Sequence, residues 1–214
     1  MEKNNDIALK TAEYLLQIKA IKLNLQNPFT WASGWKSPIY CDNRKTLSYP
    51  KIRTYIRQQF AEMIREEFGV PDVIAGVATG AIAQGVLVAQ ELGLPFVYVR
   101  SEPKSHGLTN LIEGVVESGQ SVVIIEDLIS TGGSSLKAVE ALREIGCDVK
   151  GMAAIFTYEF PKAIDAFKKA GCRLVTLSNY STLLVQAVDS KFIQEEDIKH
   201  LSTWRESPET WGNK

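Results

Sequence analysis

The 214-residue sequence has few cysteines, no long apolar run and almost no net charge, and each shortage excludes a class of protein. Cys41, Cys147 and Cys172 are widely spaced and odd in number, so we do not expect a disulfide framework. No apolar stretch is long enough to span a membrane or to form the core of a signal peptide. The formal net charge of -1 gives no overall attraction for nucleic acid or an anionic membrane. We therefore expect a cytoplasmic protein with reduced thiols.

The composition is that of an ordinary globular protein. Hydrophobic residues make up 45% and charged residues 23% of the chain. A sequence of this length and composition can bury a full core without disulfide bonds or structural metal ions. No GxGxxG sequence follows an expected strand, and no Walker GKS or GKT sequence is present. These absences exclude a Rossmann-type oxidoreductase and a Walker-type nucleotide enzyme. The length suits one α/β domain with a small appendage, or two small domains.

The first part of the chain carries two helical patterns separated by a turn-rich stretch. Apolar residues at helical spacing predict a helix over residues 6–23. A second amphipathic helix is expected to begin at Pro50 and to end at Gly69. The stretch between them, residues 27–49, is rich in proline, glycine and aromatic residues. It predicts a small irregular region in front of the main domain.

Beyond residue 70, short apolar runs alternate with helical segments. The runs predict strands at 72–77, 95–100, 121–125, 151–156 and 173–177, and the segments between predict helices at 80–92, 134–145 and 161–170. Continuously apolar strands are buried on both faces, so the fold class is α/β with a central, mainly parallel sheet flanked by helices. Ligands of such sheets bind beyond the carboxyl ends of the strands. The loops after residues 77, 100 and 125 are therefore the places to seek chemistry.

The loop after residue 125 has the composition of a sugar-phosphate site. Glu126 and Asp127 follow an apolar run, and a turn rich in glycine and hydroxyl groups, residues 130–134, leads into the next helix. Backbone N–H groups and the positive end of that helix favour an anion. The two acids suit the vicinal hydroxyls of a sugar or a nearby Mg²⁺. The alternative is structural: the acids end a strand and Ser134 caps a helix.

This segment resembles the signature of the type I phosphoribosyltransferase family, which is two hydrophobic residues, two acids, a spacer and a Ser/Thr-Gly turn. The resemblance implies that Glu126 and Asp127 hold the ribose hydroxyls of phosphoribosyl pyrophosphate (PRPP). It also implies that the loop after them binds the 5-phosphate, with Asp127 counted among the catalytic residues. The implied PRPP-binding loop residues are Leu128, Ile129, Ser130, Thr131, Gly132, Gly133 and Ser134.

A basic segment follows the strand expected at 95–100. Arg100, Lys104 and His106 place three potentially cationic groups on a loop that carries glycine and proline. Such groups stabilise the charge that grows on a leaving pyrophosphate. Residues 101–120 are also long for a connection in a compact domain, which favours a flexible lid loop. The alternative interpretation is a solvated loop lysine and a structural histidine.

The same segment resembles the catalytic loop of orotate phosphoribosyltransferases. The resemblance implies that Arg100, Lys104 and His106 bind PRPP and that Lys104 and His106 are catalytic. In a homodimer, these two residues would reach the neighbouring subunit. Mg²⁺ is the implied cofactor, bound mainly through PRPP near Glu126 and Asp127 and not by direct protein ligands. The implied partners are the small molecules PRPP and orotate, with no nucleic acid and no membrane.

The turn-rich stretch is similar to the hood that covers the base in these enzymes, through Ser33-Gly34 and the Ser37-Pro38-Ile-Tyr40 sequence. Tyr40 offers a ring for stacking, and Lys36 and Arg44 offer charge for the orotate carboxylate. Ser130 is the implied loop hydroxyl nearest the base. The alternative is a plain hydrophobic cluster of Trp31, Trp35 and Tyr40. The resemblance thus divides the chain into an N-terminal helix and hood at 1–49 and a core at 50–214, with the lid at 101–120, as one functional unit.

The sequence departs from some relatives at four places. Ala32 and Ser101 stand where those relatives carry lysines, and the loop from Gly76 to Ala81 lacks their lysine. The arginine that contacts the orotate carboxylate in them is replaced near Thr157-Tyr158. Because one branch of the family lacks the same cations, we interpret these differences as a subfamily trait. They leave the orotate contacts open.

Two other functions fit parts of the pattern. A non-catalytic regulator that senses PRPP would keep the phosphate loop, but this chain also keeps the lid cations and has no additional domain. A phosphoribosyltransferase for another base would share the loop, and only the hood and the lid argue against it. The sequence favours orotate as the base, in de novo pyrimidine synthesis.

Overall fold

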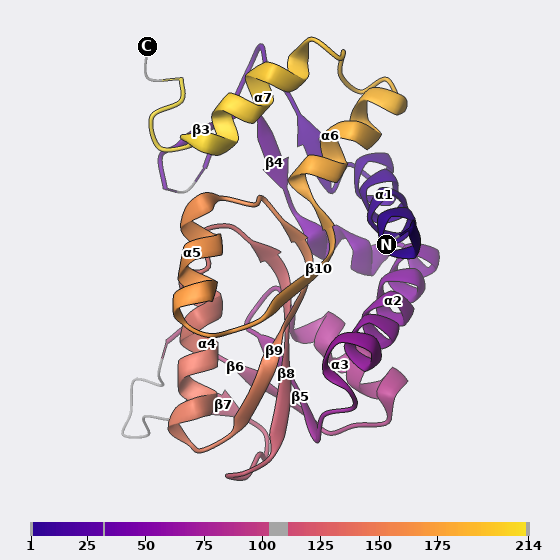
Figure 1. Cartoon of the computed structure of the whole chain (residues 1–214). Coiled ribbons are helices and arrows are strands. Elements are labelled where there is room, and N and C mark those ends of the chain that lie inside the picture. Colours follow the sequence, from indigo (N-terminus) through magenta and orange to yellow (C-terminus); the bar gives the residue numbers. More distant parts are fainter. Residues whose placement is uncertain (1, 32, 103–110, 213–214) are drawn as a thin grey trace.

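A computed structural model of the chain describes residues 2–31, 33–102 and 111–212, and its centre is a six-stranded sheet (Figure 1). The strand order is β10-β9-β8-β5-β6-β7, and every neighbouring pair is parallel except β6 with β7. The strands are β5 (Val73–Val77), β6 (Phe96–Val99), β7 (Ile112–Glu113), β8 (Ser121–Ile129), β9 (Asp148–Thr157) and β10 (Leu174–Asn179). The predicted α/β class with a mainly parallel sheet is confirmed.

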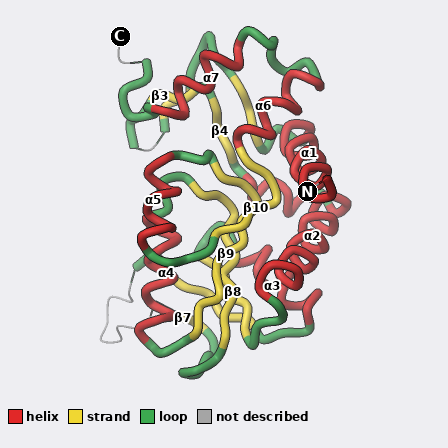
Figure 2. The backbone as a smooth tube through the Cα atoms, in the orientation of Figure 1, coloured by secondary structure: helices red, strands yellow, loops and turns green. Residues whose placement is uncertain are grey.

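Helices cover both faces of this sheet (Figure 2). One layer consists of α1 (Glu2–Gln17), α2 (Pro50–Phe68) and α3 (Ile82–Leu92), and the other of α4 (Gly133–Glu144) and α5 (Pro161–Lys169). β5 is buried along its whole length, because apolar side chains on both of its faces meet a helical layer. Gly69 ends α2 as expected, with a positive φ of 75°.

The hood lies beyond the carboxyl ends of the strands, where β10 leads into α6 (Tyr180–Asp189) (Figure 1). It consists of an antiparallel pair, β1 (Ile21–Leu23) with β4 (Ile39–Cys41), a small hairpin of β2 (Phe29–Thr30) and β3 (Lys36–Ser37), and the 3-10 helix η1 (Asn43–Ser48). The final helix, α7 (Asp197–Glu206), packs beside it. Neither α6 nor α7 was expected from the sequence.

An aromatic cluster joins the hood, the core and α7. The ring of Trp31 lies 5.2 Å from that of Tyr158 and 5.7 Å from that of Trp204, measured between centroids. Trp204 is fully buried. The ring of Trp35 stacks on Trp31 from outside at 6.3 Å. For these two hood tryptophans the hydrophobic-cluster interpretation is therefore confirmed.

Three expected boundaries are wrong, and tertiary pairing explains each. The first helix ends at Gln17 and not at residue 23, because Ile21–Leu23 pairs with β4. Strand β8 continues to Ile129, so the two acids lie inside the strand and not after it. Part of the expected lid, Ile112–Glu113, forms the edge strand β7 beside β6. No periodicity in the sequence reveals such partners, because they come from distant parts of the chain.

Candidate active site

The carboxyl ends of β5 and β8 and the start of α4 surround a hollow of about 320 Å³, here called the acid-pair hollow. The hood closes one side of it. Its lining residues are Cys41, Asp42, Arg44, Val77, Ala78, Gly80, Glu126, Asp127, Leu128, Ser130, Thr131, Gly132, Gly133, Ser134 and Ser135. All but one of the loop residues expected to bind PRPP thus line one space, the exception being Ile129, which is fully buried. The location agrees with the rule for parallel sheets.

Glu126 is the inner member of the acid pair. Its side chain is buried, and each carboxyl oxygen already accepts a hydrogen bond. Ser135 Oγ donates to Oε2 at 2.9 Å, and the Asp127 backbone N–H donates to Oε1 at 2.9 Å. Burial, followed by the nearby charge of Asp127, raises the pKa of Glu126 to about 8. Near neutral pH, Glu126 is therefore mainly protonated and can donate as well as accept.

Asp127 is the outer, half-exposed member of the pair. Burial raises the pKa of its carboxyl group, while the hydrogen bond to Glu126 and the positive charge of Arg44 lower it. A Cβ atom at Gly80 would lie 2.6 Å from the Asp127 carboxyl group, so only glycine allows this approach. The two acids are thus not equivalent. Asp127 is the carboxylate with capacity left for a ligand.

The loop after the acids leaves backbone donors free for an anion. Gly132 has a φ of 82°, a left-handed conformation that favours glycine, and α4 begins at the next residue. No side chain caps this helix, so the interpretation of Ser134 as a cap is wrong. The N–H groups of a first helical turn have no partner within the helix. A phosphate placed there meets these donors and the positive end of the helix dipole.

The hood is tied to the acid strand by one buried amide. Asn43 Nδ2 donates to the backbone oxygen of Asp127 at 2.6 Å, across 84 positions in the chain. Cys41 Sγ in turn donates to Asn43 Oδ1 at 3.2 Å. Burial, together with the charge of Asp127, raises the pKa of the Cys41 thiol well above its ordinary value, so the group stays protonated. Cys41, Asp42 and Asn43 were not among the expected site residues, although they directly follow the hood tyrosine.

Two predicted site residues, Lys36 and Arg100, lie away from the acid-pair hollow, and two more lie outside the described residues. Lys36 Nζ donates to Thr30 Oγ1 at 2.8 Å and lines a separate hollow with His200 and Trp211. Arg100 pairs with Glu113 of β7 at 3.5 Å. Lys104 and His106 belong to residues 103–110, which lie outside the described ranges.

Tyr40 is 40% exposed on the hood, and its ring lies 5.8 Å from that of Phe29. It does not line the acid-pair hollow in the described structure. The roles expected for Tyr40, Lys36 and Arg100 in binding therefore stay predictions.

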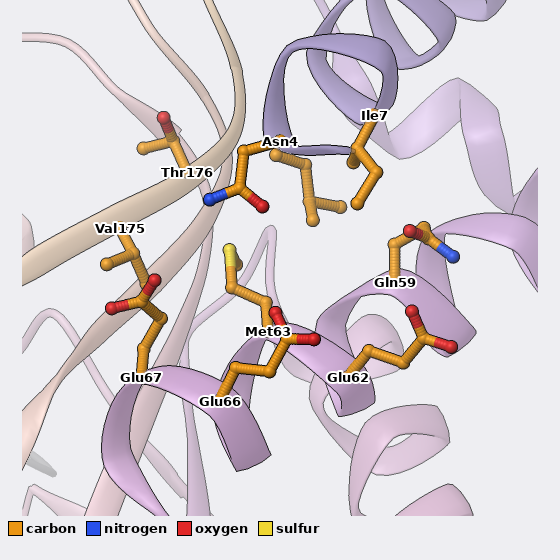
Figure 3. Close-up of a pocket in the computed structure, with 10 residues that line it drawn as sticks. Asn4, Ile7, Gln59, Glu62, Met63, Glu66, Glu67, Val175 and Thr176 are labelled. Atoms are coloured by element: carbon orange, nitrogen blue, oxygen red, sulfur yellow. The ribbon is translucent and has the colours of Figure 1, made fainter. Parts of the chain in front are cut away.

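Another hollow, between α1, α2 and β10, has a different character (Figure 3). Met63 and Ile7 supply apolar lining, and the carboxyl groups of Glu62, Glu66 and Glu67 lie along its edge. Lys3 pairs with Glu66 at 2.8 Å. This hollow has no glycine loop and is edged by carboxylates, so it does not suit a phosphate. The acid-pair hollow is the candidate active site.

The raised pKa of Glu126 predicts a pH-dependent gain in stability for Glu126→Gln. Folding favours the protonated carboxyl group, so protonated Glu126 stabilises the unchanged protein. This stabilisation is complete below the ordinary pKa of 4.5 and is lost as the pH rises through about 8. Glutamine cannot ionise. We expect the free energy of unfolding of the variant, relative to the unchanged protein, to increase by about 2–4 kcal/mol between about pH 5 and about pH 9.

Denaturant titrations at the two pH values measure this difference. Glu140→Gln, on the exposed side of α4, is the control for loss of one surface carboxylate. A difference between Glu126→Gln and the unchanged protein that is the same at both pH values would contradict the buried, protonated carboxyl group.

The proteins to which this chain is similar agree with the geometry of the acid-pair hollow. The family described as "Phosphoribosyl transferase domain" matches residues 47–159, which include the acids, the phosphate loop and the lid. The chain belongs to this family of phosphoribosyltransferases. Over almost its whole length it is similar to orotate phosphoribosyltransferases in particular. The Phocaeicola vulgatus enzyme is 64% identical over 200 residues, which are 94% of either chain.

Two further relatives agree. The orotate phosphoribosyltransferase of Listeria monocytogenes serotype 4b is 53% identical over 206 residues, which are 96% of this chain and 99% of that protein. The crystal structure of orotate phosphoribosyltransferase from Aeropyrum pernix has a TM-score of 0.73 and 28% identity, and the match covers 82% of this chain and 96% of that one. The expected type I phosphoribosyltransferase fold is therefore confirmed.

The described residues offer neither a membrane-spanning helix nor a cluster of metal ligands. None of the described helices is long and apolar enough to cross a membrane. Within residues 2–31, 33–102 and 111–212, no group of three or more His, Cys, Asp or Glu side chains is placed to hold a metal ion.

Proposed function

We propose that this protein transfers the ribose 5-phosphate group of PRPP to orotate, which gives orotidine 5-phosphate and pyrophosphate in pyrimidine synthesis. The observation that carries the proposal is the acid-pair hollow, in which two adjacent carboxyl groups and an uncapped helix start face one space. The similarity to orotate phosphoribosyltransferases over nearly the full chain supports the choice of base.

PRPP lies lengthwise in the hollow in this proposal. Its 5-phosphate accepts hydrogen bonds from backbone N–H groups of residues 130–134 and the first turn of α4. Asp127 accepts hydrogen bonds from the ribose hydroxyls. Glu126 lies on the inner side of Asp127, where Ser135 and the Asp127 N–H hold its carboxyl group in place. The ribose is thereby fixed at both ends, which orients its anomeric carbon for attack.

The bond that breaks joins the anomeric carbon to the pyrophosphate oxygen, and the electron pair leaves with pyrophosphate. The ring nitrogen of the orotate anion attacks the same carbon from the opposite face and forms the new bond. Positive charge develops on the sugar, and Asp127 lies on the side of its hydroxyls. Negative charge develops on the leaving group, where we assign Arg100, Lys104 and His106. Closure of the lid excludes water that would trap the sugar.

Mg²⁺ is the cofactor of this proposal, and the residues present fit it. Mg²⁺ is usually bound through one or two carboxylates together with phosphate oxygens of the substrate. The acid-pair hollow offers two adjacent carboxyl groups beside the phosphate loop. Glu126 and Asp127 are the side chains that would lie beside Mg²⁺ bound mainly through PRPP, and the ion would supply positive charge for the pyrophosphate oxygens.

The proposal includes a homodimer in which Lys104 and His106 of one subunit act at the site of the other. It rests on the resemblance of the 101–120 segment to the catalytic loop of orotate phosphoribosyltransferases. A hybrid of two impaired variants tests it and is described in the Discussion.

A panel of bases tests the proposed function. The protein is mixed with PRPP, Mg²⁺ and, in turn, orotate, uracil, adenine, guanine and hypoxanthine. We expect orotate alone to be consumed at an enzymatic rate, with one pyrophosphate released for each orotate. Preferred consumption of another base would change the assigned substrate. Binding of PRPP with no turnover of any base would instead indicate a PRPP sensor.

A further inference from the structure

Arg44 is the one lysine or arginine among the described residues that line the acid-pair hollow. It follows Asn43, the residue tied to the backbone of Asp127, so its position is fixed relative to the acids. Orotate differs from uracil by one carboxylate on the ring. A second anion beside the Asp127 carboxylate needs a cation close by, because like charges at short range repel.

We propose that Arg44 binds the carboxylate of the base and thereby selects a carboxylated pyrimidine. This inference rests on the proposed function, because it names the group of the base that the same site recognises. It concerns a binding and specificity residue, not a group that moves a proton or breaks a bond.

The hydrogen bonding of Arg44 suits this role. Its Nε donates to Asp42 Oδ1 at 2.7 Å, which orients the guanidinium group from one side. That bond uses the inner nitrogen and leaves the two terminal nitrogens for a ligand. A planar guanidinium fork matches a carboxylate with two parallel hydrogen bonds, which a lysine cannot provide.

The position of the Arg44 charge also suits the binding of a ligand anion. Arg44 and Asp127 line the same hollow, so the positive charge lies near that carboxyl group. The side chain of Arg44 is 59% exposed and that of Asp42 20%, so the pair lies at the mouth of the hollow and not in its floor. An incoming base therefore meets the guanidinium group before it reaches the acids.

The other candidates for this role either lie elsewhere or carry no charge. Lys36 is bound to Thr30 and lines the hollow near α7. The position at which some relatives carry an arginine is occupied by Thr157 and Tyr158, both buried and uncharged. Among the described residues that line the hollow, Arg44 is thus the cation available for a carboxylate.

Two nucleotides that differ only in the carboxylate test the inference. Orotidine 5-phosphate and uridine 5-phosphate share the ribose phosphate, and only the former has the carboxylate. We expect Arg44→Gln to lower the affinity for orotidine 5-phosphate by about 10- to 100-fold and to leave that for uridine 5-phosphate unchanged. Arg44→Lys keeps the charge without the fork. We expect its affinity for orotidine 5-phosphate to lie between those of the unchanged protein and of Arg44→Gln. Isothermal titration calorimetry measures all the affinities.

Lys45→Gln is the matched control. Lys45 is the next residue of η1, its Nζ donates to the backbone oxygen of Lys19 at 3.1 Å, and it does not line the hollow. An equal loss of affinity for both nucleotides in Arg44→Gln would assign the arginine to the ribose phosphate and overturn the inference. So would unchanged affinity for both. If the unchanged protein itself did not prefer orotidine 5-phosphate, the proposed function would fail first. Thermal unfolding of each variant confirms that it is folded.

Discussion

Replacing Asp127 with alanine is expected to weaken PRPP binding by about 10- to 100-fold while the protein stays folded. Hydrogen bonds to a charged group contribute more than neutral ones, and Asp127 is the member of the pair with free acceptor oxygens. The fold should tolerate the change for two reasons. Burial raises the pKa of Asp127, so its charge does not favour folding. Asn43 binds the backbone oxygen of residue 127, which the variant keeps.

Titration of PRPP in the presence of Mg²⁺ measures this effect. Asp72→Ala is the matched control, because Asp72 accepts hydrogen bonds from Ser121 at the opposite end of the same strand. We expect a smaller effect from Glu126→Gln than from Asp127→Ala, since both oxygens of Glu126 are already occupied. Unchanged PRPP affinity in Asp127→Ala would remove the ribose-hydroxyl role from this residue.

Replacing Lys104 with alanine is expected to lower kcat by about 100-fold or more and to change the KM for PRPP less. The proposed role of Lys104 is to meet charge that appears only as the bond to pyrophosphate breaks. An interaction made mainly in the transition state lowers kcat when it is lost, and substrate binding changes less. Steady-state rates with saturating orotate and PRPP measure the effect.

Lys137→Ala, an exposed lysine on α4, is the control for loss of one positive charge. Near-normal turnover of Lys104→Ala would exclude the lysine from catalysis. The dimer proposal has a separate test, in which Lys104→Ala and Asp127→Ala proteins are mixed under conditions that exchange subunits. If the lid acts on the neighbouring subunit, hybrid dimers regain one intact site, so activity should return. No recovery, with exchange shown independently, would place the lid in its own subunit's site.

The parts of the site that are continuous in the chain were predictable from the sequence. A buried strand, two acids, a glycine turn and a helix start follow one another within residues 121–135, so their order alone defines an anion site next to carboxylates. The five parallel strands of the central sheet were also recognisable, because burial on both faces demands uninterrupted apolar residues. Their positions were right to within a few residues, except for the carboxyl end of β8.

The contacts between distant segments were not predictable. The sequence contains Asn43 and Gly80 without any sign that one holds the backbone of Asp127 and the other makes room for its carboxyl group. Lys36 and Arg44 looked alike as candidates for the orotate carboxylate. Only packing separates them, because the hood hairpin turns Lys36 towards Thr30 while η1 brings Arg44 to the hollow.

The sequence by itself determined the class of fold, the phosphate loop and the chemical types available to the site, since these depend on neighbours along the chain. Tertiary structure alone decided which acid is buried and protonated, which cation lines the hollow and how the hood is attached. The physical reason is that burial and hydrogen bonding set the charge and orientation of a side chain, and both depend on residues far away in the sequence.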